Sequence, residues 1–271
     1  MKILITGGTG FVGKNLIEYY RDNHTIIETK RGDHIPTVCE RQRPDLIINS
    51  AAEIYNKETM FDSNVELTRM FLEYVKSNPS ARMIQIGSGA EYGDVNRATT
   101  EADTIKPYDM YSATKGMATL LCQGYARSYN LDVVILRPYS PYGPGEKPHR
   151  LFPNLWRAFK LGRPMDLVMG VHDFCYIDDF VEALDLIVNS DKRIPGEIIN
   201  ISSGVQTGNA EVLSTFRSIT GLQGDINVKN IFSTWPHWQA DISHVKNKYG
   251  WKPRFSLEQG IRKFLEIAKY E

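Results

Sequence analysis

Short apolar runs alternate with longer stretches in which apolar residues recur at helical spacing. The short runs predict strands, and unbroken ones such as 45–49 predict burial on both faces of a parallel sheet. Strands are expected at 2–6, 24–28, 45–49, 83–86, 132–136, 167–169 and 198–201. Helices are expected at 12–20, 35–43, 61–76, 108–128, 152–160, 178–189, 209–220, 242–249 and 257–268. This alternation indicates an α/β fold.

Three glycines follow the first strand at three-residue spacing: Gly7, Gly10 and Gly13. A helix begins directly behind them, so the pattern predicts strand, glycine turn and helix. Backbone N–H groups at a helix N-terminus attract anions, and glycine lets a pyrophosphate come close. The first thirteen residues therefore predict a dinucleotide site.

A Pro- and Gly-rich stretch, 137–145, is the main break in composition. We place a domain boundary there. Residues 1–138, together with about 171–190, are expected to form the dinucleotide-binding domain. Residues 139–170 and 191–271 are expected to form a smaller substrate-binding lobe.

Charge and cysteine content narrow the possible functions. Lys plus Arg and Asp plus Glu number 32 each, which argues against a nucleic-acid or membrane-surface partner. The 3 cysteines have no metal or disulfide spacing, so we expect no metal site. We expect no signal peptide, no membrane span and a cytoplasmic location.

The end of the second strand bears on cofactor choice. Folds of this kind carry an acidic residue there for the ribose hydroxyls of NAD. Here Lys30 and Arg31 stand at that position, with Glu28 just before them. Cations suit the 2′-phosphate of NADP, so NADP(H) is favoured and NAD(H), read by Glu28, stays possible.

Tyr111 and Lys115 are four residues apart and share one face of a predicted helix. A nearby ammonium favours the phenolate, so we expect Lys115 to lower the pKa of Tyr111 and make it a general acid/base. Ser88 follows a buried strand and can hydrogen-bond the same substrate oxygen. Small residues Ala51 and Ala52 end another strand, where tight packing and cofactor approach explain them equally well.

Ordered motifs along the whole chain resemble the extended short-chain dehydrogenase/reductase family, in its NAD-dependent epimerase/dehydratase branch. They are GGTGFVG (7–13), 64–65, SGAEYG (88–93), 111–115, RPYSPYGPG (137–145), HDFCYIDD (172–179), NISSG (200–204), ADIS (240–243) and YGWKP (249–253). The resemblance implies a doubly wound Rossmann domain with a C-terminal substrate lobe, a nucleotide-sugar substrate and a homodimer.

The resemblance also assigns roles to individual residues. Tyr111 is implied as acid/base, Lys115 as its partner on the nicotinamide ribose, and Ser88 as the group that orients the substrate oxygen. The implied cofactor site is Gly7, Thr9, Gly10, Phe11, Val12, Gly13, Lys30, Arg31, Ala51, Ala52, Asn64, Tyr111, Lys115 and Pro138. The implied substrate site is Ser88, Gly89, Ala90, Ser140, His149 and His172.

Departures from the family pattern guide the choice of reaction. The 4,6-dehydratases carry Thr-Asp-Glu where this chain has Ser88, Gly89 and Ala90, so water loss is not expected. Asn is usual at Ser140 and Arg at His172, so either the diphosphate is held differently or the substrate is not a common sugar nucleotide. The candidates for that task are Lys147, Arg150, Lys229, His172 and His237.

Three hypotheses follow. The first is an NADPH-dependent reductase of a 4-ketosugar nucleotide. The second is a 4-epimerase that retains NAD. The third is a cofactor-binding member of the family without turnover.

Overall fold

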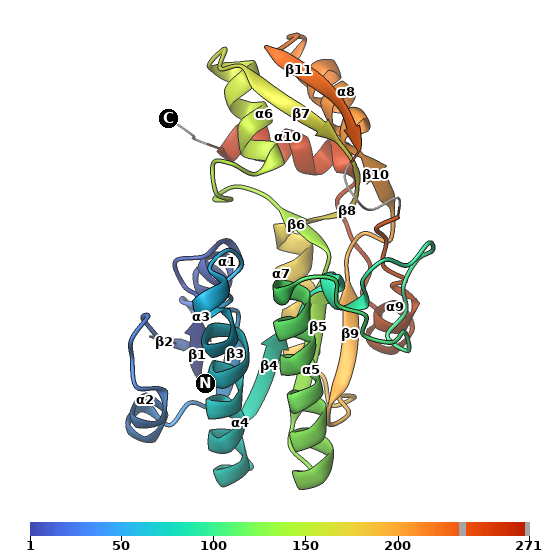
Figure 1. Ribbon diagram of the computed structural model, residues 1–271. Helices are drawn as coiled ribbons and strands as arrows, with labels where there is room; N and C mark the ends of the chain where they lie inside the picture. Colours follow the sequence, from blue (N-terminus) through green and yellow to red (C-terminus); the bar gives the residue numbers. More distant parts are fainter. Residues whose placement is uncertain (233–236, 269–271) are drawn as a thin grey trace.

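The computed structural model describes residues 1–232 and 237–268, and its larger part is a six-stranded parallel sheet (Figure 1). The strand order is β2-β1-β3-β4-β5-β9. Their bounds are β1 (Lys2–Thr6), β2 (Thr25–Glu28), β3 (Leu46–Asn49), β4 (Arg82–Ile86), β5 (Val133–Pro138) and β9 (Glu197–Ile201). The order reverses between β1 and β3, and ligands bind at such a switch point, beyond the carboxyl ends of the strands. The expected α/β class with a doubly wound parallel sheet is confirmed.

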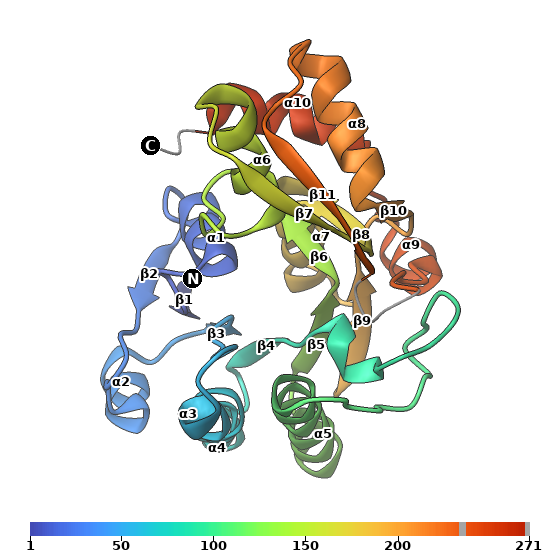
Figure 2. The same ribbon diagram turned by 45° about the horizontal axis from the view of Figure 1, so that its top comes forward.

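Helices cover both faces of this sheet. On one face lie α2 (Ile35–Gln42), α4 (Leu67–Ser77) and α5 (Met110–Tyr129), and Figure 2 shows α4 beside α5. On the other lie α1 (Phe11–Tyr20) and α7 (Ile177–Val188). Alternate residues of β3 serve the two faces, since Ile47 packs with the α4 and α5 side and Ile48 with the α1 and α7 side.

The helix expected over 61–76 begins earlier and changes pitch. It consists of α3 (Lys57–Phe61), a π-helical turn (Asp62–Glu66) and α4 in direct succession. The start is set by Asn56, whose side-chain oxygen accepts the Glu58 N–H at 3.1 Å.

The smaller lobe stands beyond the carboxyl ends of the main sheet (Figure 1). It contains a sheet of β10 (Gln206–Gly208), β8 (Val171–Tyr176) and β6 (Ser140–Tyr142), and a pair of β11 (Ile226–Phe232) and β7 (Met165–Met169). Its helices are α6 (Leu151–Lys160), α8 (Asn209–Thr220) and α10 (Leu257–Ile267). Aromatic rings fill its core, with Tyr142 stacked on Phe152 at 4.0 Å between centroids.

Two strands correct the expected domain boundaries. We assigned 191–271 to the lobe, but β9 within it is the sixth strand of the main sheet, and α9 (Ser243–Tyr249) packs on β9. We also assigned about 171–190 to the dinucleotide domain, whereas β8 pairs with β6 and β10. Strand pairing between distant segments decides both memberships, and local sequence does not encode it.

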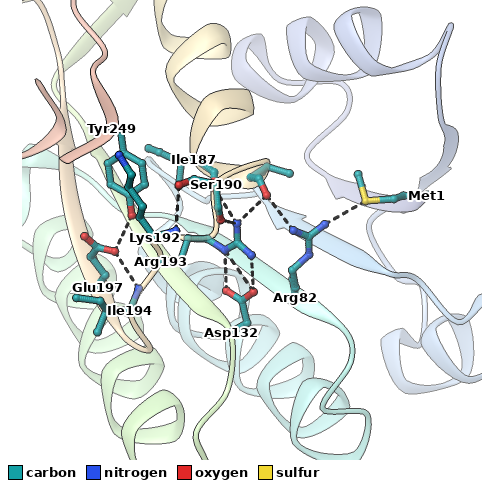
Figure 3. A network of polar contacts seen from close by, with 11 residues as sticks. Met1, Arg82, Asp132, Ile187, Ser190, Lys192, Arg193, Ile194, Glu197 and Tyr249 are labelled. Atoms are coloured by element: carbon teal, nitrogen blue, oxygen red, sulfur yellow. Dashed lines mark hydrogen bonds and ion pairs between the residues drawn. The ribbon is translucent and has the colours of Figure 1, made fainter.

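A polar network holds the β9 edge at the amino ends of the strands (Figure 3). The Arg193 guanidinium donates to Asp132 at 2.9 and 3.0 Å and to the Val188 carbonyl at 2.8 Å. The Glu197 carboxylate accepts from Lys248 at 2.6 Å and from Tyr249 at 2.7 Å. These bonds lie at the opposite end of the sheet from the glycine turn.

The three cysteines are buried and free, as expected of small core residues. Within the described ranges, no helix has the length and apolar character needed to cross a bilayer.

Candidate active site

The glycine turn joins β1 to α1 and is built from close backbone contacts. Gly10 N–H donates to the Gly7 carbonyl at 2.8 Å. A Cβ on Gly13 would lie 2.2 Å from that same carbonyl oxygen, and Gly7 has a φ of +69°. No side chain caps the first turn of α1, so its N–H groups are available to an anion. The predicted turn therefore fits a pyrophosphate.

The end of β2 is arranged differently from the expectation that favoured NADP. The Glu28 carboxylate lies over the turn, because its Oε2 is 3.0 Å from where a Cβ on Gly8 would stand. Arg31 donates to Glu53 at 2.7 Å, so its guanidinium already has an anionic partner. Lys30 makes no ion pair among the side chains of 1–232 and 237–268. The acid stands nearest the glycines, which favours a ribose with free hydroxyls.

Asn64, named above as a cofactor ligand, lies buried in the π-helical turn. Its amide donates to Thr114 Oγ1 at 2.9 Å and to the Glu53 carbonyl at 3.0 Å. Its oxygen accepts the Glu53 N–H at 2.8 Å. In this structure Asn64 ties α5 to the loop after β3, which also contains Ala51 and Ala52. Ala51 N–H in turn donates to Thr6 Oγ1 at 2.9 Å.

Ser88 and Tyr111 come from different elements and meet. Ser88 follows β4, and its Oγ accepts the Ala90 N–H at 3.1 Å. Tyr111 stands in the first turn of α5, where Asp109 caps the helix by accepting the Ser112 N–H at 2.8 Å. The Ser88 side chain lies close enough to the Tyr111 phenol to lower the pKa of Tyr111. The two groups are therefore placed to share one substrate oxygen.

The pKa of Tyr111 differs from the expectation. Burial raises the pKa of Tyr111 to about 12, although the nearby Ser88 side chain acts the other way. Lys115 is 3% exposed and donates from Nζ to the Ile86 carbonyl at 2.5 Å. Burial lowers the pKa of Lys115 to about 8, against the pull of the Glu91 carboxylate. The pKa of Tyr111 is therefore raised in the protein chain alone and not lowered as expected from Lys115, so its phenol is neutral at pH 7.

Residues on the lobe side form two contacts. Ser140 Oγ and His172 Nδ1 lie 3.3 Å apart. Burial, and then Arg150, lower the pKa of His172 to about 4, so this imidazole is neutral at pH 7. His149 Nε2 lies 2.9 Å from Tyr55 Oη, so the loop after β6 touches the loop after β3.

Residues 3–202 match the model of the NAD dependent epimerase/dehydratase family. The chain belongs to the NAD-dependent epimerase/dehydratase family. It is 27% identical to the low-salt glycan biosynthesis protein Agl12 of Haloferax volcanii, over 96% of each chain.

Solved structures agree with this family in fold. A dTDP-glucose 4,6-dehydratase from Bacillus anthracis, in complex with NAD, has a TM-score of 0.88 and 26% identity, covering 98% of this chain and 96% of its own. A UDP-glucuronic acid 4-epimerase from Bacillus cereus, in complex with UDP-glucuronic acid and NAD, has a TM-score of 0.87 and 23% identity over 98% of each chain. This chain is thus an enzyme of the NAD-dependent epimerase/dehydratase type. The neighbours hold NAD, and an NADP preference finds no support in them.

The turn after β4 carries two small residues directly behind Ser88. A Cβ on Gly89 would lie 3.0 Å from the Tyr139 ring, and Ala90 is buried. The nearest acid in sequence, Glu91, has a fully buried carboxylate paired with Arg137 at 2.7 Å. The carboxylic acid within this turn is therefore buried and paired.

Sequence reasoning missed Glu146 and named Arg150 only among several cations. Their side chains lie 3.6 Å apart, and burial raises the pKa of Glu146 to about 7. The Arg150 charge also lowers the pKa values of Tyr111 and His172. The four-residue spacing of an acid and a base in 146–150 was the available signal.

Pro138 stands at the end of β5, level with Ile201 of β9, at the carboxyl edge of the sheet. In the part of the chain that the structure describes, no three His, Cys, Asp or Glu side chains gather to hold a metal ion.

Proposed function

We propose that this protein oxidises and re-reduces one secondary alcohol carbon of a nucleotide-linked sugar, using NAD and without losing water. The simplest reaction of this kind is 4-epimerisation. The observation that carries the proposal is the closeness of the Ser88 and Tyr111 side chains, near buried Lys115 and a turn whose carboxylic acid is buried and paired. The NAD-bound epimerase and dehydratase neighbours support the substrate class.

The chain's own residues account for the proton. In the reductive direction the neutral Tyr111 phenol donates its proton to the substrate oxygen, while Ser88 hydrogen-bonds that oxygen. In the oxidative direction the phenolate form of Tyr111 receives the hydroxyl proton, so the phenol first has to release its own proton to solvent. Lys115 places a positive charge next to the end of β4 and compensates negative charge that forms there. When bound, NAD supplies the hydride acceptor and donor.

The proposed cofactor is NAD. Its pyrophosphate is assigned to the 7–13 turn, and its adenosine ribose hydroxyls to Glu28. The second candidate is an NADPH-dependent 4-ketosugar reductase, favoured by one observation: Lys30 stands at the end of β2 without an ion-pair partner in the described residues. This reductase was the leading hypothesis from the sequence, where both Lys30 and Arg31 favoured NADP. Because Arg31 is paired with Glu53, only Lys30 is left to favour it.

We assign the diphosphate of the proposed nucleotide-sugar substrate to Arg150. Ser140 and His172 are the neutral polar groups near Arg150. On the same side of the site, His149 contacts Tyr55 of the loop after β3. A guanidinium is a better phosphate ligand than an imidazole, because it can contact two phosphate oxygens at once.

We also propose a homodimer in the cytoplasm. The outward face of α5 carries Met117 and Leu120, which are 45% and 57% exposed. Exposed apolar side chains three residues apart on a long helix suit a helix-to-helix contact with a second copy.

The test is turnover of UDP-glucose, UDP-glucuronic acid and dTDP-glucose, each followed by product analysis of the sugar. Wild-type protein is expected to form the 4-epimer of at least one of them with no added cofactor. Tyr111→Phe should keep NAD binding and lose turnover. Formation of a 4-keto-6-deoxy product, or full activity of Tyr111→Phe, would overturn the proposal.

A further inference from the structure

Glu91 is a buried carboxylate without a part in the chemistry above. It lies in the 3₁₀ turn of Gly89–Tyr92, between β4 and α5, and is 0% exposed. Buried carboxylates are rare unless they are paired. Its three partners indicate what it does.

The first partner is the backbone of the catalytic serine. Ser88 N–H donates to Glu91 Oε1 at 2.8 Å, while Ser88 Oγ accepts the Ala90 N–H, which makes a capping box. The main chain and the hydroxyl of Ser88 are thus both fixed by the turn. The remaining hydrogen-bonding capacity of the hydroxyl is left for Tyr111 and the substrate.

The second partner is Arg137 of β5, whose side chain is 1% exposed. Its Nε donates to Glu91 Oε2 at 2.8 Å. The guanidinium lies over the Tyr92 ring at 4.3 Å, and Tyr92 Oη donates to Asn200 of β9 at 2.8 Å. The carboxylate therefore connects the catalytic turn to two strands of the sheet.

The third contact is with Gly87. A Cβ at this position would lie 2.5 Å from Glu91 Oε1, so the glycine leaves the space that the carboxylate occupies. Gly87, Glu91 and Arg137 therefore pack together next to Ser88.

We propose that Glu91 is a positioning residue: its carboxylate, anchored by Arg137, holds the Ser88 backbone and so aims the serine hydroxyl at Tyr111. This role rests on the proposed function, because it serves the same Ser88–Tyr111 pair. It assigns Glu91 no contact with substrate and no proton transfer.

Three variants separate positioning from simple support of the fold. Glu91→Gln keeps a side-chain oxygen for the Ser88 N–H and removes the charge. The double variant Glu91→Leu/Arg137→Met replaces the pair by apolar side chains, a change that is often neutral or stabilising for a buried ion pair. Glu197→Gln is the control, because it removes another buried, paired carboxylate at the far end of the sheet.

The expected result is a separation of stability from turnover. The double variant should unfold within a few degrees of wild type, bind NAD within about twofold, and turn over UDP-glucose or UDP-glucuronic acid roughly 10²-fold more slowly, as small misplacements of reacting groups do. Glu91→Gln should fall between it and wild type, and Glu197→Gln should keep its kcat. Recovery of both stability and kcat in the double variant would overturn the proposal.

A measurement without substrate keeps this test independent of the proposed function. Amide hydrogen exchange of segment 87–92 should be faster in the double variant than in wild type, with Glu197→Gln unchanged. If wild type turns over no nucleotide sugar, the proposed function fails and the exchange rates alone decide whether Glu91 holds Ser88. Unchanged exchange in the double variant would overturn the positioning role.

Discussion

Replacing Lys115 by Met should make the protein more stable and inactive. Lys115 is almost fully buried, and burial lowers its pKa from 10.5 to about 8. A shift of this size means that the folded state carries the ammonium at a cost of roughly 3 kcal/mol at neutral pH. Met has a similar length and no charge, so Lys115→Met removes this cost.

Lys115→Met also removes a hydrogen bond, which reduces the gain in stability. Lys115 Nζ donates to the Ile86 carbonyl at 2.5 Å, and leaving that acceptor unpaired costs about 1–2 kcal/mol. The net gain is therefore about 1–2 kcal/mol, or a rise of roughly 2–8 °C in Tm for a chain of this size.

The gain in stability from Lys115→Met should decrease as pH rises. The folded-state pKa lies below the unfolded value, so the cost is complete below about pH 8. It fades as pH rises to the unfolded pKa near 10.5. Lys115→Met should thus exceed wild type in stability at pH 7 and lose that advantage near pH 10.

Urea unfolding at several pH values measures this, with the exposed Lys246→Met as control. Equal stabilisation at pH 7 and pH 10 would refute the reasoning, as would a less stable Lys115→Met at pH 7.

The remaining predictions concern the cofactor, the substrate, the dimer and the fold. Glu28→Ala should weaken NAD binding about tenfold or more without weakening NADP, because a hydrogen bond to a charged group is lost; calorimetry measures this, and tighter NADP than NAD binding by wild type would contradict it. Arg150→Met should raise KM for UDP-glucuronic acid roughly tenfold with little change in kcat, whereas Lys160→Met, at the other end of α6, should change neither. Leu120→Glu should yield monomers in sedimentation, and an unchanged mass would argue against the α5 interface. Burial acts to raise the pKa of Glu197, but hydrogen bonds from Lys248, Tyr249 and His244 outweigh it and lower the pKa. The contribution of Glu197 to stability is therefore present above pH 4.5 and is lost as pH falls through its folded-state pKa. Glu197→Gln should lower Tm at pH 7 but much less at acid pH.

The fold was predictable because its strongest signals are local. The glycine turn and the apolar run 45–49 indicate a parallel sheet directly, and the family motifs indicate the Rossmann topology. The membership of β8 and β9 was not predictable from local pattern, because it depends on which distant strands pair.

Ser88 and Tyr111 lie close together and Lys115 is buried on the same helix as Tyr111, but the pKa values of these groups were not predictable. Spacing places Tyr111 and Lys115 on one face, yet burial decides both pKa values, and burial depends on the whole fold. The pairing of Arg31 with Glu53 across 22 residues likewise has no local signature. The hydrogen bond by which Asn64 joins α5 to the π-helical turn also links distant segments and has no local signature. The role of Asn64 as a cofactor ligand stays a prediction.

The most direct test of the central claim is the absorbance of reduced nicotinamide in the purified enzyme after UDP-glucose or UDP-glucuronic acid is added. The account predicts a transient rise in wild type, in step with formation of the epimer, and no rise in Tyr111→Phe carrying the same amount of NAD. A rise in Tyr111→Phe equal to that of wild type, or epimer formed by wild type with no change in nicotinamide absorbance, would contradict it.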